Sequence, residues 1–211
     1  MTYKIQHIPL GNSLPENNPH SVSVSLPTLE DVIGYEENRP EILNQLKNGY
    51  PRFFKNKMVQ KLEEHVKNLH QIDDSKMVFP ITSIHAKKLI ENLVEDHFES
   101  ITFENVCFLI LPKNHEKIIQ VKKIIQNIGA IISSRNAEKI LFEKGIISEL
   151  FKEERLETEQ PEEEITKILS EAYSAKKENI FLTNSGTNAV FSAIETLTQI
   201  KRKEGKTLNV Q

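Results

Sequence analysis

The apolar run Val-Cys-Phe-Leu-Ile-Leu at residues 106–111 places the tightest limit on how this chain can fold. Every position is hydrophobic, β-branched and aromatic side chains are frequent, and Pro112 follows directly. Such a run predicts a buried strand, and the proline predicts its end, because proline cannot donate to a strand ladder. The segments around this strand therefore decide the fold class.

Segments with helical spacing of apolar residues alternate with short strand-like runs. Two further strands are predicted at 76–81 (KMVFPI) and 179–183 (NIFLT). The predicted helices span 56–70, 83–98, 115–129, 165–176 and 188–200, and another begins after Ser133 or Ser134. Gly129 is expected to end its helix as the C′ residue. This alternation indicates an α/β protein with parallel strand pairing.

Composition divides the chain into four regions. Residues 1–28 hold four of the nine prolines and several Asn and Ser residues, which predicts an extended N-terminal arm. Within it, SVSVSL alternates as an edge strand does. Residues 29–151 form an α/β region, 152–165 an acidic linker, and 166–211 the start of a further domain.

Charge and composition exclude several classes of function. The chain has 27 Lys and Arg against 30 Asp and Glu, a formal net charge of -3, so duplex nucleic acid is not an expected partner. No stretch approaches the roughly 20 apolar residues that span a bilayer, and the N-terminus lacks the apolar core of a secretory signal. A single cysteine, Cys107, fits a reducing compartment. We expect a soluble, cytoplasmic protein with no membrane or nucleic-acid partner.

The turn at 184–187 (Asn-Ser-Gly-Thr) is the strongest candidate site. Between a strand and a helix it would present free N–H groups at the helix N-terminus, where the dipole and the hydroxyls of Ser185 and Thr187 favour a phosphate. Alternatively, one of these hydroxyls only caps the helix while Gly186 eases the turn. Spacing alone favours the capping interpretation.

Other residues are weaker candidates. Arg135, among serines in ISSRNAE, could grip a phosphate through its planar guanidinium, or the serines could simply cap a helix. Tyr50 and Arg52, within GYPRFF, could bind a ligand or form an aromatic plug with a structural ion pair. The histidines are scattered without metal-ligand spacing, so no metal site is predicted.

The segment LTNSGTNAV at 182–190 resembles the phosphate-binding turn of the cystathionine γ-synthase family, the pyridoxal-phosphate enzymes of cysteine and methionine metabolism. That turn reads Ser/Thr-Gly-Met-x-Ala, so Ser185, Gly186, Asn188 and Ala189 fit. Thr187 replaces methionine at a position that contributes mainly its backbone N–H in the family. The segments 8–12, 19–37, 46–54 and 132–138 are similar to a divergent branch of the family known in fungi and some bacteria.

The resemblance implies a fold, a cofactor and a reaction. The chain would be the N-terminal part of a fold-type I transferase, and residues 166–211 would begin the domain that binds pyridoxal 5'-phosphate. The complete enzyme would be a homo-oligomer acting on a small amino-acid substrate. It would perform transsulfuration by γ-replacement or elimination on an activated homoserine or cystathionine.

In the family, a Tyr-x-Arg pair from the neighbouring subunit also holds the cofactor phosphate. Arg135 is the preferred counterpart because it precedes the helical region that leads to the turn, with Ser133 in place of the aromatic residue. Tyr50-Pro51-Arg52 has the fuller pattern but lies much farther upstream. Both alternatives stay open.

The family also uses a Schiff-base lysine and an aspartate at the pyridinium nitrogen, both well downstream of the glycine turn. No lysine among 201–207 has a suitable strand context, so no catalytic residue is predicted in this chain. On this resemblance the 211 residues alone would be inactive, as a truncated or split copy of the enzyme. The alternative is a non-catalytic α/β interaction module derived from the same fold.

Overall fold

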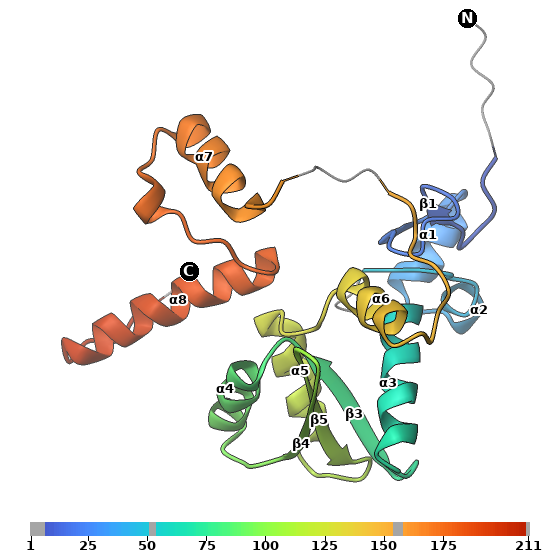
Figure 1. The fold of residues 1–211 in the computed structure, drawn as a ribbon, viewed down its shortest axis with the longest axis horizontal. Helices are drawn as coiled ribbons and strands as arrows, with labels where there is room; N and C mark the ends of the chain where they lie inside the picture. The colour runs from blue at the N-terminus through green and yellow to red at the C-terminus, as the bar shows by residue number, and fades with distance from the viewer. Residues whose placement is uncertain (1–6, 51–53, 154–157, 210–211) are drawn as a thin grey trace, which may run out of the picture. The chain divides into compact units, whose positions relative to one another are not determined.

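A computed structural model describes residues 7–50, 54–153 and 158–209 (Figure 1). The chain forms two compact units. The first comprises Met1–Lys122 with Ile131–Phe151, and the second comprises Lys123–Ala130 with Lys152–Gln211. Helices and strands are mixed, which confirms the predicted α/β character in its broad sense.

The first unit is built on a three-stranded sheet in the order β3-β5-β4. Its strands are β3 (Lys76–Ile81), β4 (Glu99–Phe103) and β5 (Val106–Pro112). The central strand β5 is buried from Val106 to Leu111, as the apolar run predicted.

The predicted parallel pairing is wrong, because both neighbours of β5 run antiparallel to it. β4 and β5 are separated only by Glu104 and Asn105, with Glu104 at a φ of 53°. A connection this short can join only antiparallel strands. β4 was missed because its sequence, ESITF, follows directly on a helix that had been predicted to continue to Phe98.

Helices α3 (Lys57–Leu69) and α6 (Ser134–Glu143) cover one face of this sheet. Side chains from α3, from α6 and from alternate positions of β5 form one core cluster: Val59, Leu62, Val66, Val106, Phe108, Ile110, Ala137, Ile140 and Leu141. The Asn56 side chain caps α3 by accepting from the amide of Met58 at 2.9 Å. The predicted helix 56–70 is confirmed, although its Leu69 is exposed rather than in the core.

Helix α4 (Ile84–Val94) contacts β5 and is shorter than predicted. It ends at Glu95, which adopts a left-handed conformation with φ 55°. Its buried positions are Ile90, Glu91 and Val94.

From residue 7 onward, the N-terminal segment makes contacts within its own unit. It contains β1 (Ser13–Leu14) and β2 (Ser23–Val24), which pair antiparallel, and then α1 (Leu29–Glu36) and α2 (Pro40–Leu43). Its backbone carbonyls find partners farther along the chain. The Pro19 carbonyl accepts from Asn56 Nδ2 at 2.7 Å, and the Gly11 carbonyl accepts from the Lys47 amide at 2.9 Å.

The second unit is helical where the structure describes it. α5 (Ile118–Ile128) contributes residues to both units, and α7 (Pro161–Tyr173), the 3₁₀ turn η1 (Lys177–Asn179) and α8 (Gly186–Lys203) belong to the second. α7 begins four residues before the end of the predicted linker 152–165, because Pro161 and three glutamates suit the first turn of a helix.

The predicted strand 179–183 is absent from the described structure. Its side chains are exposed except for the half-buried Ile180, Phe181 is 82% exposed, and no described strand pairs with the segment. An apolar run needs a neighbouring strand to accept and donate its ladder bonds, and none of the described residues provides one here.

Candidate functional site

The turn before α8 is held by the Ser185 side chain. Ser185 is the N-cap residue in an extended conformation, and its Oγ accepts from the Asn188 amide at 3.1 Å. The Thr183 hydroxyl donates to the Ser185 carbonyl at 2.9 Å. Ser185 therefore caps α8, and Gly186 is the first residue of the helix.

Two asparagines join this turn to the end of α5. Asn184 Nδ2 donates to the Gly129 carbonyl at 3.1 Å, and Asn188 Nδ2 donates to the Ile128 carbonyl at 2.8 Å. The last carbonyls of a helix have no partner within that helix, so these amides satisfy groups that would otherwise need water. All four residues lie in the second unit.

Two glycines near the turn, Gly129 and Gly186, differ in how closely other atoms approach them. Gly129 adopts φ 64°, as predicted for a C′ glycine, and a β-carbon there would collide with Ser185 Oγ. At Gly186, by contrast, a β-carbon would meet no described atom within 4 Å. The chain therefore packs tightly against Gly129 and leaves space beside Gly186.

The groups at the helix start suit an anion. No described residue accepts a hydrogen bond from the amides of Gly186 or Thr187, which are the first two of the helix. These N–H groups carry the positive end of the dipole of an 18-residue helix. Capping engages the Ser185 oxygen only as an acceptor, so its O–H remains able to donate to a bound oxyanion.

The remaining predicted site residues lie in the first unit. Arg135 is the second residue of α6 and is exposed, and Ser133 caps that helix by accepting from the Asn136 amide at 3.1 Å. Tyr50 is 55% exposed. Arg52 lies outside the described residues.

A buried polar pair beside Arg135 was not predicted from the sequence. His20 Nε2 lies 3.0 Å from Glu138 Oε2, and His20 Nδ1 lies 2.9 Å from Ser134 Oγ. His20 and Glu138 are 118 positions apart, so no local pattern could indicate their contact.

Among the residues that the structure describes, no group of three or more His, Cys, Asp or Glu side chains is arranged to hold a metal ion. Among the helices that the structure describes, none combines the length and apolar character that a membrane crossing requires.

The chain is similar to curated enzymes over most of its length. It is 30% identical over 213 residues to a cystathionine gamma-synthase of Saccharomyces cerevisiae, covering 92% of this chain and 32% of that protein. It is 30% identical over 191 residues to an L-2-amino-4-chloropent-4-enoate dechlorinase/desaturase of Streptantibioticus cattleyicolor, covering 89% of this chain and 37% of that enzyme. A cystathionine gamma-synthase of Neurospora crassa is 35% identical over 130 residues, 58% of this chain and 21% of the relative.

The chain thus spans about a third of the length of the first two relatives. No protein-family model matches it, and no solved structure matches it either.

Proposed function

Because the chain is related to the cystathionine γ-synthase-like enzymes, we propose that it forms part of a pyridoxal-phosphate-dependent enzyme of transsulfuration. The complete enzyme would carry out γ-replacement or elimination on an activated homoserine or cystathionine. The observation that carries this proposal is the pair of amides at the start of α8, Gly186 and Thr187, which have no acceptor among the described residues, beside the open side of Gly186.

The residues at this turn fit the phosphate of the cofactor. The amides of Gly186 and Thr187 and the hydroxyl of Ser185 are donors, which is what a phosphate oxygen requires. The space at Gly186 lets an anion reach the backbone, and a side chain there would obstruct it. When bound, pyridoxal phosphate supplies an electron sink for the amino-acid substrate.

In this proposal the turn binds and orients the cofactor and does not move protons. Asn184 and Asn188 fix the turn by bonding to the last carbonyls of α5. Ser185 is fixed by its capping bond, so its hydroxyl donates from a set position. We call Ser185, Gly186 and Thr187 the phosphate seat. Because the seat is rigid, it loses little conformational freedom when the ligand binds, which favours affinity.

We also propose that an arginine from a neighbouring subunit of the homo-oligomer binds the cofactor phosphate. Arg135 and the Tyr50-x-Arg52 pair are the two candidates. Arg135 is exposed at the start of α6, and Tyr50 is exposed just before α3. Each could therefore reach a second subunit, and substitution of each arginine is needed to separate them.

Binding of a phosphate ester without an aldehyde tests the seat directly. Adding pyridoxine 5'-phosphate to ¹⁵N-labelled protein should shift the amide resonances of Gly186 and Thr187, whereas pyridoxine, which lacks the phosphate, should not. Gly186→Val should abolish the shift, and Ser185→Ala should weaken binding by about 1.5–3 kcal/mol, the contribution of one hydrogen bond to a charged group. Equal shifts with both compounds would reject the phosphate seat.

The alternative function is a non-catalytic interaction module. The observation that favours it is the exposure of apolar side chains on α7 and α8, neither of which has a buried residue in the described structure. A module of this kind would bind a partner, and pyridoxine 5'-phosphate would not shift the amide resonances of Gly186 and Thr187. The same titration therefore separates the two functions.

A further inference from the structure

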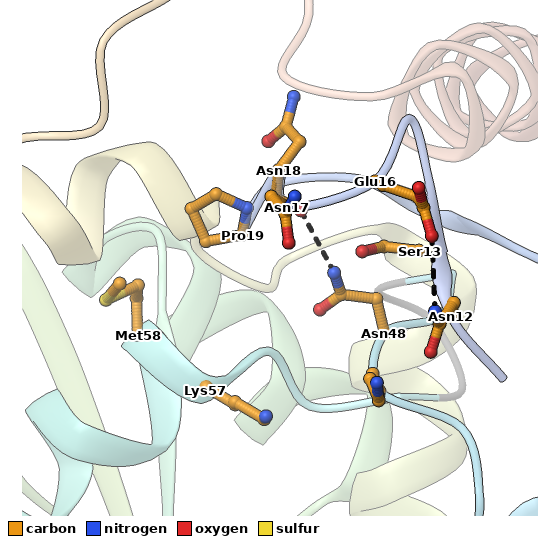
Figure 2. Close-up of a pocket in the computed structure, with 10 residues that line it drawn as sticks. Asn12, Ser13, Glu16, Asn17, Asn18, Pro19, Asn48, Lys57 and Met58 are labelled. Atoms are coloured by element: carbon orange, nitrogen blue, oxygen red, sulfur yellow. Dashed lines mark hydrogen bonds between the residues drawn. The ribbon is translucent and has the colours of Figure 1, made fainter.

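A pocket of about 250 Å³ lies in the first unit, between the N-terminal hairpin and the start of α3 (Figure 2). Asn48 Nδ2 donates across it to the Asn18 carbonyl at 3.1 Å, and Asn12 Nδ2 donates to Glu16 Oε1 at 3.3 Å. These bonds fix the rim. The pocket is separate from the α8 turn, which belongs to the second unit.

Two buried polar groups in this pocket have unmet hydrogen bonds. Ser13 is only 9% exposed, its hydroxyl points into the pocket, and no described residue bonds to that hydroxyl (Figure 2). Asn48 is 6% exposed, and because its nitrogen faces the Asn18 carbonyl, its oxygen is the atom left without a partner in the described structure. Buried polar groups in native proteins are rarely left unpaired, so each marks a place where a ligand or water binds.

Both signs of charge line the same pocket. Lys47 and Lys57 form no ion pair with any described residue, and neither does Glu16. Glu16 and Lys57 lie on opposite sides of the pocket (Figure 2). A ligand that carried only negative charge would satisfy the lysines but would leave the Asn48 oxygen without a donor. It would also face the negative Glu16 carboxylate, whose described donor is Asn12 Nδ2 alone.

The unmet groups therefore need a ligand with donors at one end and acceptors at the other. An α-amino acid has both, since its ammonium group carries three donors and its carboxylate only acceptors. Pro19 and Met58 add an apolar wall, which suits a short aliphatic side chain. The volume of about 250 Å³ is enough for a small ligand of this kind.

We propose that this pocket binds a free α-amino acid as its zwitterion. Lys47, Lys57 and the Ser13 hydroxyl receive the carboxylate, and Glu16 with the Asn48 oxygen receives the ammonium group. This site does not depend on the phosphate seat, because none of its residues belongs to the second unit.

The test compares three probes that share a five-carbon chain and carry different charged groups. L-norvaline is the zwitterion, L-norvalinamide keeps only the ammonium group, and pentanoate keeps only the carboxylate. Isothermal titration of the 211-residue chain should give binding of L-norvaline that is at least tenfold tighter than binding of either single-charge probe. Amide shifts of Ser13 and Asn48 should locate it.

Two variants and a control complete the test. Glu16→Gln and Lys57→Gln should each weaken L-norvaline binding at least tenfold. Lys88→Gln removes an exposed lysine with no described partner, elsewhere in the same unit, and should leave binding unchanged. Equal binding of pentanoate or inorganic phosphate that survives Glu16→Gln would overturn the proposal in favour of a plain anion site. No binding of L-norvaline would overturn it as well.

Discussion

His20 and Glu138 form a buried pair inside the first unit, with 3.0 Å between His20 Nε2 and Glu138 Oε2. Their side chains are 0% and 5% exposed. The other carboxylate oxygen of Glu138 accepts from the Phe151 amide at 2.9 Å, and the His20 ring meets the Phe151 ring edge-on. This contact ties the N-terminal segment, the start of α6 and the end of the first unit together.

Removing the imidazole should destabilise the first unit strongly. His20→Ala removes the hydrogen-bond partner of Glu138 Oε2 inside the core, and a buried acceptor left unsatisfied costs about 1–3 kcal/mol. Unfolding in urea should show this loss. His85→Ala is the matched control, since His85 is exposed on α4 and has no described partner, and it should change the free energy of unfolding by less than about 0.5 kcal/mol. Equal effects of the two substitutions would contradict a structural role for His20.

Because of Glu91, the free energy of unfolding should fall at acid pH. Burial acts to raise the pKa of this carboxyl, but the Lys87 ammonium group at 2.7 Å and the Phe98 amide at 2.8 Å outweigh it, and the net pKa is lowered. A lowered pKa in the folded state stabilises the protein above the unfolded value of 4.5, and this stability is lost as pH falls below it.

The measurement is the free energy of unfolding at neutral pH and below pH 4.5. Glu91→Gln should destabilise at neutral pH by about 1.5–3 kcal/mol, because it removes a charged hydrogen-bond acceptor, and should lose less stability on acidification than the parent. Glu116→Gln changes an exposed carboxyl without a described partner and serves as the control. Parallel pH profiles for the parent and Glu91→Gln would disprove the assignment.

Cys107 should be inert while the protein is folded. Burial of the thiol in β5 raises its pKa, and the side chain is in the core. The thiolate is the reactive form, so both its scarcity and its inaccessibility slow alkylation. Iodoacetamide at pH 8 should modify the folded protein at least about 100-fold more slowly than the protein in denaturant. Similar rates in the two states would show that β5 opens readily.

Local patterns predicted the elements that depend on local forces. The buried strand β5, the strand β3 and the helix α3 were all recognisable, because side-chain periodicity and composition set them. The antiparallel pairing was not recognisable, since it depends on the short link between β4 and β5 and on which strands meet. The strand at 179–183 failed for a related reason: propensity without a partner strand does not make a ladder.

The same division applies to the candidate site. The Ser185 cap and the Gly129 helix end were predictable because each depends on a few neighbouring residues. The bonds from Asn184 and Asn188 to α5 were not, since they join residues 55 and 60 positions apart. For that reason the sequence could suggest a seat but not what holds it in place.

The contact between Gly129 and Ser185 provides the last prediction. Gly129→Ala introduces a β-carbon at a left-handed φ of 64°, directly against Ser185 Oγ and 3.2 Å from the Asn188 amide nitrogen. Gly205→Ala is a matched control in the same unit, because Gly205 has φ 71° and no described atom within 4 Å of an added β-carbon. Both substitutions carry the backbone strain of a left-handed residue, roughly 1 kcal/mol, but only the first displaces the turn.

Hydrogen exchange followed by mass spectrometry separates these effects. Peptides covering residues 184–190 should exchange faster in Gly129→Ala, because the capping bond from the Asn188 amide to Ser185 is lost, and should keep their rate in Gly205→Ala. If the turn also seats a phosphate, Gly129→Ala should weaken pyridoxine 5'-phosphate binding while Gly205→Ala leaves it unchanged. Unchanged exchange in Gly129→Ala would mean that α5 does not hold this turn, and the rigid seat would have to be abandoned.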